Sequence, residues 1–426
     1  LMSYVRSRFF IASILAAQAA GTATVAAQSS GTSAERILAH ITFLADDARE
    51  GRGVGTAGLD SAAQYIASRF MEIGLERATP HGFLQRFTIS PTAPAAAHSG
   101  IGGAAVANVV GIHPGRGNLK NQAVVVGAHY DHLGYGGFGS LEPDSVPVIH
   151  NGADDNASGT AVLIEVARLL RSRSADNMRS LVFVAFTAEE SGLIGSDYYV
   201  KNPVISNDST FAMLNMDMVG YVTENRLTAF GAKTAKEFDA LLDSINTAYG
   251  FQLSASGDGY GRSDQQSFFV QKIPVLHFFT GTHENYHRPT DDTEYINADG
   301  AARVASLVAD LTWNLATRNE PLSFVDAEPP TMTSSGGYGA YLGSIPDMSE
   351  SPDGVRLTGV RAGSPADIAG IRAGDVIIGI GEFDVSDLYE MTDALRSHRP
   401  GDTVTIRVRR GGEALELIAT LGKRGG

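Results

Sequence analysis

The chain has 426 residues, of which 43% are hydrophobic and 19% are charged, a composition typical of a globular protein with more than one domain. Its formal net charge of −14 disfavours nucleic acid as a partner. It contains no cysteine, which excludes disulfides, thiol catalysis and thiolate metal sites.

The first 27 residues are typical of a secretory signal peptide. Arg6 and Arg8 form a basic start, an apolar stretch runs from Phe9 to Ala20, and small residues at 25–27 resemble a cleavage site. A membrane anchor is the alternative, but polar residues interrupt the apolar stretch and leave it short for a span of about 20 residues. We therefore expect an exported protein, periplasmic or secreted, that is free of the membrane after cleavage.

Hydrophobic patterns predict alternating strands and helices. Residues 34–74 show helical spacing on both sides of a glycine-rich loop at 50–56. From residue 107 onward, short apolar runs typical of strands buried on both faces alternate with helical segments. This order predicts a mostly parallel, mixed sheet sandwiched by helices. The expected strands are Ala107–Ile112, Ala123–Ala128, Leu181–Phe186, Phe211–Met216 and Ile273–Phe278, and the expected helices are Gly159–Arg171, Ser191–Val200, Thr234–Tyr249 and Asp299–Leu315.

The second half of the chain contains a candidate linker. Residues 318–335 are rich in proline and small polar residues, a composition typical of a connection between domains. We therefore expect a signal peptide at 1–27, a larger α/β domain at 28–317, the linker at 318–335, and a small β-rich domain at 336–424.

Side chains of the kind that bind metal ions gather near the ends of the predicted strands, where open α/β sheets form their functional crevice. Histidine and carboxylate ligands without thiolate are typical of catalytic zinc sites. One ligand from each of five segments gives two histidines and three carboxylates. Five ligands are too many for one tetrahedral zinc with an open position, and they suit two zinc ions that share a carboxylate and a water. The candidates are His129 and Asp131, then Asp154 and Asp155, then Glu189 and Glu190, then Asp217, and finally His287.

Each of these residues also has an ordinary structural explanation. Asp155 is placed to cap the helix that follows it, and Glu190 is placed as an acid in a first helical turn. Such explanations become weak when five successive segments near strand ends all carry residues of the ligand type. Glu189 and Glu190 are adjacent and must point in different directions, so one can bind metal while the other acts as a base. Asp131 could hydrogen-bond the second ring nitrogen of His129 and fix its tautomer.

The motifs GAHYDHLG, NGADDNASG, FTAEESGLIGS, NMDMVG and YHRPTDD, with FLADDAREGRGVGTAG before them, resemble the co-catalytic dizinc aminopeptidases of the aminopeptidase Y family. The resemblance extends from about Glu35 to Asn314. It implies a zinc exopeptidase fold, two Zn²⁺ ions, and peptide substrates with a free N-terminus. It implies His129 and Asp217 as ligands of one zinc, Glu190 and His287 as ligands of the other, and Asp155 as the bridge.

The same resemblance implies roles for three further residues. Glu189 matches the general base, Asp131 the partner of His129, and Tyr286 a tyrosine that in some members hydrogen-bonds the developing oxyanion. Gln265 stands where a histidine is common, so we assign its loop no catalytic role. His132, His150 and His283 are not ligands in the family pattern, and we expect them to be structural or rim residues.

The C-terminal unit resembles a PDZ domain of the bacterial, protease-associated kind. The resemblance is carried by Gly339–Ser344, Val360–Ala366 and Gly370–Ile377, and residues 403–409 alternate as a strand should. It implies that Tyr341-Leu342-Gly343 receives a peptide C-terminus, or that an extended peptide adds as a strand. A packing domain without a ligand is the alternative.

Four other functions remain open or are disfavoured. A carboxypeptidase of the same fold would need cationic groups that cannot be placed from sequence. A glutaminyl cyclase of this family uses one zinc, whereas all five ligand positions are filled here. A non-catalytic peptide-binding protein would not need the intact Glu189. A serine hydrolase is disfavoured because the chain has no G-x-S-x-G motif.

Overall fold

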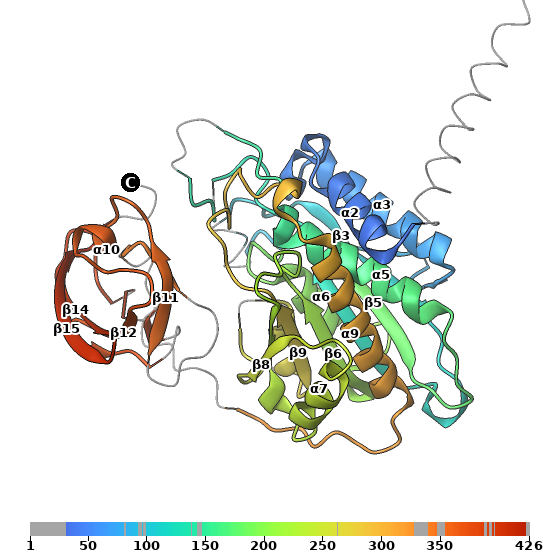
Figure 1. The fold of residues 1–426 in the computed structure, drawn as a ribbon. Coiled ribbons are helices and arrows are strands. Elements are labelled where there is room, and N and C mark those ends of the chain that lie inside the picture. Colours follow the sequence, from blue (N-terminus) through green and yellow to red (C-terminus); the bar gives the residue numbers. More distant parts are fainter. Residues whose placement is uncertain are drawn as a thin grey trace, which may run out of the picture.

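We describe a computed structural model of the chain, which contains a larger α/β unit and a smaller β-rich unit (Figure 1). The predicted signal peptide and the second part of the predicted linker lie outside the described residues. The described residues are 31–80, 82–92, 96, 99–137, 139–142, 147–261, 263–327, 340–346, 354–386, 390–391, 394–395 and 397–422.

Nine strands of the described chain form one sheet in the order β1-β3-β5-β4-β6-β9-β7-β8, with β2 paired to β3. The central run β5-β4-β6-β9 is parallel. Strand β3 is antiparallel to β5, and β7 is antiparallel to β9. The expected mixed sheet is therefore confirmed, with its parallel part at the centre. The strands are β1 (Glu76–Arg77), β2 (Leu84–Thr88), β3 (Ala105–His113), β4 (Ala123–His129), β5 (Ser180–Phe186), β6 (Thr210–Met216), β7 (Arg226–Phe230), β8 (Gln252–Ser256) and β9 (Val275–Phe279).

Helices cover both faces of this sheet (Figure 1). Side chains alternate between the faces along a strand, so Val124 and Val126 join the core under α2, α3, α5 and α9, whereas Val125 joins the core under α6 and α8. Burial on both faces explains why these strands are almost entirely apolar in sequence. The helices are α2 (Ser33–Leu44), α3 (Ala57–Ile73), α5 (Gly159–Arg171), α6 (Ile194–Lys201), α7 (Phe238–Asn246), α8 (Gln265–Phe269) and α9 (Ala298–Thr317).

The first part of the predicted linker packs against the α/β unit. Phe324 forms a β-bridge with Ala235, and its ring lies 5.6 Å from that of Phe269. The backbone N–H of Ser323 donates to the carboxylate of Glu237 at 2.8 Å.

In the described residues, no helix combines the length and the apolar character that a membrane span requires.

The β-rich unit has its own core and its own sheet, in the order β10-β11-β12-β14-β15 with β13 paired to β12. Strand β10 lies at the edge of this sheet, next to the loop expected to receive a peptide. Its elements are β10 (Ser344–Pro346), β11 (Val355–Val360), α10 (Pro365–Ile368), β12 (Val376–Ile380), β13 (Phe383–Asp384), β14 (Thr403–Arg410) and β15 (Glu413–Thr420).

Candidate metal centre

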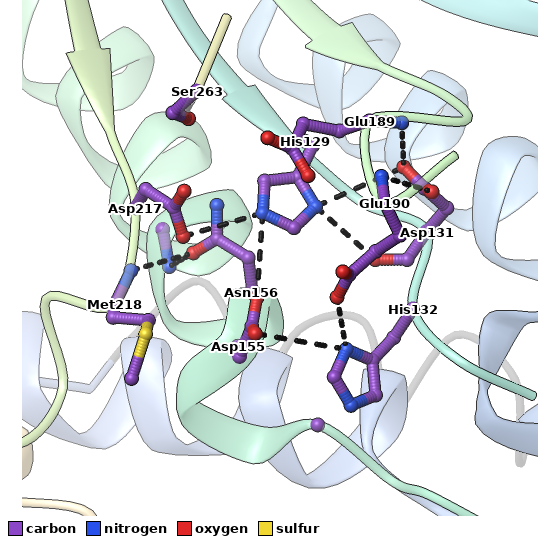
Figure 2. Close-up of polar contacts among 12 residues, drawn as sticks. His129, Asp131, His132, Asp155, Asn156, Glu189, Glu190, Asp217, Met218 and Ser263 are labelled. Atoms are coloured by element: carbon purple, nitrogen blue, oxygen red, sulfur yellow. Dashed lines mark hydrogen bonds and ion pairs between the residues drawn. The ribbon is translucent and has the colours of Figure 1, made fainter. Parts of the chain in front are cut away.

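The parallel strands bring the predicted ligands to one edge of the sheet. His129 is the last residue of β4, Glu190 follows β5, and Asp217 follows β6 directly. Asp155 comes from the loop that enters α5, and His287 comes from the loop after β9. Four of these five side chains, all except that of His287, are visible together in Figure 2.

Asp155 lies between two imidazole rings. Nε2 of His129 lies 3.4 Å from Oδ1 of Asp155 and 3.2 Å from Oδ1 of Asp217. Nε2 of His287 lies 3.1 Å from Oδ2 of Asp155 and 3.2 Å from Oε2 of Glu190. The two oxygens of one carboxylate therefore belong to two different groups of ligand atoms.

These separations fit zinc. Zinc–nitrogen and zinc–oxygen bonds are about 2.0–2.2 Å long, so two ligand atoms at neighbouring corners of a tetrahedron lie roughly 3.3–3.5 Å apart. The four separations between a histidine nitrogen and a carboxylate oxygen are 3.1–3.4 Å, within or slightly below this range. The donor set contains imidazole and carboxylate groups and no thiolate, which also suits a catalytic zinc site.

His132 joins this cluster, although the sequence pattern predicts a structural or rim role for it. Its Nδ1 lies 2.7 Å from Oε1 of Glu190 and 3.9 Å from Oδ2 of Asp155. The sequence did contain one indication that His132 lies at the site, which is its position three residues after His129 in the same strand-end segment. His150 does lie apart from the ligands, bonded to the Ser140 hydroxyl at 2.8 Å.

Asp131 contacts the two glutamates more directly than it contacts His129. Its Oδ1 accepts from the backbone N–H of Glu189 at 3.1 Å, and its Oδ2 accepts from that of Glu190 at 3.4 Å. Its Oδ1 lies 3.7 Å from Nδ1 of His129, and its own carbonyl oxygen is nearer to that nitrogen, at 3.2 Å. Asp131 thus fixes the turn that carries both glutamates.

The neighbouring Asp154 and Asp155 have different partners. Oδ1 of Asp154 accepts from the backbone N–H of Gly220 at 2.7 Å, and its Oδ2 lies 3.2 Å from Nε2 of His283. The Asp291 carboxylate accepts from the backbone N–H groups of both Asp154 and Asp155, at 3.0–3.1 Å. Protein donors therefore satisfy Asp154, while the side chain of Asp155 is left for the metal.

Arg52, in the glycine-rich loop, links two ligand-bearing segments. It is fully buried, and its guanidinium donates to the carbonyl oxygens of Tyr130, Asn151 and Gly152, and to that of Leu44, at 2.6–2.8 Å. Burial lowers the pKa of Arg52 to about 10, although Asp131 and Asp155 oppose that shift. Arg52 thus holds the segment after His129 against the segment before Asp155.

Three turns at the site hold non-glycine residues with left-handed backbone. Ala188 (φ 55°) precedes Glu189, Met218 (φ 52°) follows Asp217, and His287 itself has φ 56°. Such conformations are uncommon for residues with a Cβ and cost on the order of 1–3 kcal/mol each. Their occurrence at three ligand-bearing turns is typical of a site whose surroundings impose its geometry.

The electrostatics show a strongly acidic, buried site. Burial alone would lower the pKa of His129, but Asp217 and Glu189 raise it well above the usual value. Burial raises the pKa of Glu189 well above the usual value, and the nearby Glu190 adds to the shift. Burial and Asp155 would raise the pKa of Glu190, but His287 and His132 lower it to about 2. Carboxylates buried together are costly unless cations compensate them, which favours bound metal.

Two other residues of the sequence analysis border the centre. The ring of Tyr286 stacks on His287 with 3.9 Å between ring centroids, and burial raises the pKa of its phenol well above the usual value. Gln265, in place of the common histidine, accepts from Nδ1 of His277 at 2.9 Å. The adjoining Asp264 is fully buried, and burial raises its pKa to about 7.

Family models match both units. Residues 108–312 match the model described as peptidase family M28, and residues 336–421 match that of the PDZ domain. Residues 108–312 therefore resemble the M28 peptidases, and residues 336–421 resemble PDZ domains. The M28 match agrees with the zinc-type donor set, and the PDZ match agrees with the expected β-rich C-terminal unit.

Curated relatives of the M28 domain include aminopeptidases. The chain is 32% identical over 215 residues to aminopeptidase YwaD of Bacillus subtilis, covering 47% of this chain and 43% of that protein. It is 25% identical over 299 residues to leupeptin-inactivating enzyme 1 of Streptomyces exfoliatus, covering 65% of this chain and 60% of that protein. The chain therefore spans about half the length of these relatives.

Solved structures agree on the fold. BSAP, a zinc aminopeptidase from Bacillus subtilis, superposes with a TM-score of 0.55 at 20% identity, covering 68% of this chain and 97% of that structure. A glutaminyl cyclase from Bacteroides thetaiotaomicron superposes with a TM-score of 0.53 at 16% identity, covering 66% of this chain and 97% of that structure. The fold therefore does not distinguish a peptidase from a cyclase.

Proposed function

We propose that this protein is an aminopeptidase that removes N-terminal residues from peptides with the help of two zinc ions. The observation that carries the proposal is the position of Asp155, whose two oxygens face His129 and His287 separately. His129 and Asp217 would hold one ion, Glu190 and His287 the other, and Asp155 would bridge them. Zinc at this position polarises a carbonyl group and makes water a better nucleophile at neutral pH.

The protein's own residues have separate roles in this proposal. Glu189 takes a proton from the attacking water and gives it to the leaving amine. Its backbone is fixed by Asp131 at 3.1 Å, which keeps the carboxylate in place between the two steps. Tyr286 supplies a neutral hydroxyl donor for the developing oxyanion.

One peptide in two forms distinguishes the possible exopeptidases. The zinc-loaded protein is incubated with a peptide whose N-terminus is free and with its N-acetylated copy, and the products are measured by mass spectrometry. Stepwise loss of residues from the free N-terminus alone is expected. Cleavage from the C-terminus of both forms would make the protein a carboxypeptidase. No cleavage of either form would reject the proposal and favour a binding protein.

The base is tested with Glu189→Gln, which keeps the size of the side chain and removes its proton-accepting charge. We expect this variant to bind zinc as the wild type does and to lose turnover by at least 100-fold, the lower end of the range for such groups. Near-normal turnover would show that another group accepts the proton.

Glutaminyl cyclase activity is the second candidate, because a cyclase shares the fold. The two groups of ligand distances around Asp155 favour two metal ions, which disfavours it. A peptide with N-terminal glutamine tests this alternative directly, because cyclisation releases ammonia without shortening the peptide.

For the PDZ domain we propose binding of a peptide C-terminus, or of an extended peptide added to β10. Strand β10 lies at the edge of its sheet, where a further strand can pair. The domain also contacts the rim of the metal centre. Arg361 donates to the carbonyl of Leu141 at 3.2 Å, and the N–H of Leu141 donates to the carbonyl of His287 at 3.0 Å.

Deletion of residues 332–426 tests whether the PDZ domain recruits substrates. Loss of activity on long peptides, with activity on dipeptides retained, is the expected result. Unchanged kinetics on both would reject recruitment. Titration of full-length protein with short peptides would then show whether the PDZ domain binds peptides at all.

Finally, we propose that the protein is exported by its N-terminal segment. The support is the basic, apolar and small-residue pattern of residues 1–27. N-terminal sequencing of protein secreted by a bacterial host is expected to begin at Gln28, and an uncleaved chain retained in the cytoplasm would contradict export.

A further inference from the structure

His132 lies at the metal centre but is not one of the five proposed metal ligands. Its side chain is buried, and its Nδ1 points at Oε1 of Glu190 from 2.7 Å (Figure 2). The other oxygen of that carboxylate, Oε2, lies 3.2 Å from Nε2 of His287. The two oxygens of Glu190 therefore face two different histidines.

The distances separate a ligand from a hydrogen-bonding partner. Two atoms that bind one tetrahedral zinc lie roughly 3.3–3.5 Å apart. His287 lies 3.2 Å from Glu190 and 3.1 Å from Asp155, slightly below this range. The 2.7 Å between His132 and Glu190 is too short for two ligands of one ion and is ordinary for a charge-assisted hydrogen bond. His132 also lies farther from Asp155, at 3.9 Å.

The fold fixes the His132 ring in this orientation. The ring packs on the backbone of Gly152, where an added Cβ would lie 2.4 Å from Cδ2 of His132. The backbone N–H of His132 donates to the carbonyl of Arg52 at 3.2 Å. Nε2 is buried and has no hydrogen-bond partner among the described residues. We expect the ring to carry a proton on Nδ1, because the carboxylate of Glu190 can only accept a hydrogen bond.

We infer that His132 is a positioning residue that occupies one oxygen of Glu190 and leaves the other oxygen for the metal. It does so by donating a hydrogen bond from Nδ1. This inference rests on the proposed zinc site, and it goes beyond that site by assigning how Glu190 binds: through Oε2 alone. Hydrogen bonds of this kind to a metal ligand typically change metal affinity 10–100-fold.

Three variants of His132 test the donor position. His132→Asn places an amide nitrogen near the position of Nδ1, whereas His132→Gln reaches toward the position of Nε2, and His132→Leu has no donor. Zinc affinity is measured by competition with a chromogenic chelator, without substrate. We expect one of the two zinc ions to bind 10–100-fold more weakly in the Leu and Gln variants and within a few-fold of wild type in the Asn variant. Thermal unfolding of the apo-proteins checks that each variant folds.

Other patterns of zinc affinity would overturn the inference. Wild-type affinity in His132→Leu would show that the hydrogen bond is irrelevant to the metal. Equal and complete loss of one zinc in all three variants would make His132 a ligand. Glu190→Gln is the control for the site itself: if it leaves zinc binding unchanged, the proposed centre fails, whatever His132 does.

A measurement on wild-type protein does not depend on the folding of variants. In apo-protein with ¹⁵N-labelled histidine, long-range ¹H–¹⁵N spectra report which ring nitrogen carries the proton. We expect the proton of His132 on Nδ1, and a neutral ring protonated on Nε2 alone would reject the inference.

Discussion

The carboxylate of Asp131 accepts a hydrogen bond from the backbone N–H of Glu189, and the distance is 3.1 Å. Its second oxygen accepts from the next N–H, that of Glu190, at 3.4 Å. Asp131 lies at the end of β4 and the glutamates follow β5, so this contact joins two neighbouring strand ends. The segment that carries the proposed base and a proposed ligand is thereby attached to the segment that carries His129.

We therefore predict that Asp131→Asn lowers kcat 10–100-fold while the protein remains folded. The amide offers one acceptor oxygen in place of two, so at least one of the two N–H groups loses its partner. The measurement is kcat with a dipeptide substrate, together with the far-UV circular dichroism spectrum. Asp402→Asn is the matched control, because Asp402 accepts a backbone N–H from Arg399 at 2.8 Å on the surface of the PDZ domain. Equal activity of both variants would contradict the role of Asp131.

His129, Glu190 and Asp217 could be predicted from sequence because each lies at or shortly after the end of an apolar strand. Helix α5 was predicted at its observed bounds for a similar reason, since residues 159–171 keep helical periodicity throughout. Strands β7 and β8 were not predicted. The residues of β8 are mostly part-exposed, and both strands have only five residues, too few for a clear period.

The supporting contacts of the site could not be predicted from sequence. Arg52 contacts carbonyl groups about 80 and 100 positions later in the chain, and His132 meets Glu190 across 58 positions. No local pattern encodes such pairs, because the fold alone brings them together. The left-handed backbone at Ala188 and Met218 was also not expected, since sequence preferences point to glycine for such positions.

Zinc binding should respond differently to Asp155 and Asp217. Because the oxygens of Asp155 face both imidazoles, Asp155→Ala is expected to weaken both zinc ions, whereas Asp217→Ala is expected to weaken one. The measurement is zinc content after dialysis, by elemental mass spectrometry, and the expected ratios are near zero and near one per chain. The neighbouring Asp154→Asn is the control and should keep both ions, because Asp154 bonds to Gly220 and His283. Retention of one ion by Asp155→Ala would exclude a shared carboxylate.

Arg52→Met should destabilise the protein more than a surface arginine substitution does. The variant removes the donor from the carbonyl groups of Leu44, Tyr130 and Asn151, at a cost of roughly 3 kcal/mol or more in the free energy of unfolding. Urea unfolding measures this change. Arg52→Lys should recover part of it, because an ammonium group keeps the charge and three donors. A loss below about 0.5 kcal/mol, as at an ordinary surface position, would contradict this account of Arg52.

Glu165 should make stability depend on pH under acidic conditions. It is fully buried in α5 and accepts from Arg36 of α2 at 2.7 Å and from Arg168 at 2.5 Å. Burial alone would raise the pKa of Glu165, but the hydrogen bonds from Arg168 and Arg36 lower it from 4.5 to about 2. A carboxyl group with a lowered pKa in the folded state stabilises the fold above its unfolded pKa. That contribution, about 3 kcal/mol, is lost as the pH falls from 4.5 toward 2.

The test compares the free energy of unfolding of wild type and Glu165→Gln between pH 7 and pH 3. We expect the variant to be less stable at pH 7. The difference between the two proteins should shrink as the pH falls below 4.5, because Glu165 then takes up a proton in the unfolded state while it stays ionised in the folded state. Asp197→Asn, which removes an exposed pair with Lys201, is the control and should change stability by less than about 1 kcal/mol at any pH. A difference between wild type and Glu165→Gln that stays constant down to pH 3 would show that packing, and not the charge of Glu165, joins α2 to α5.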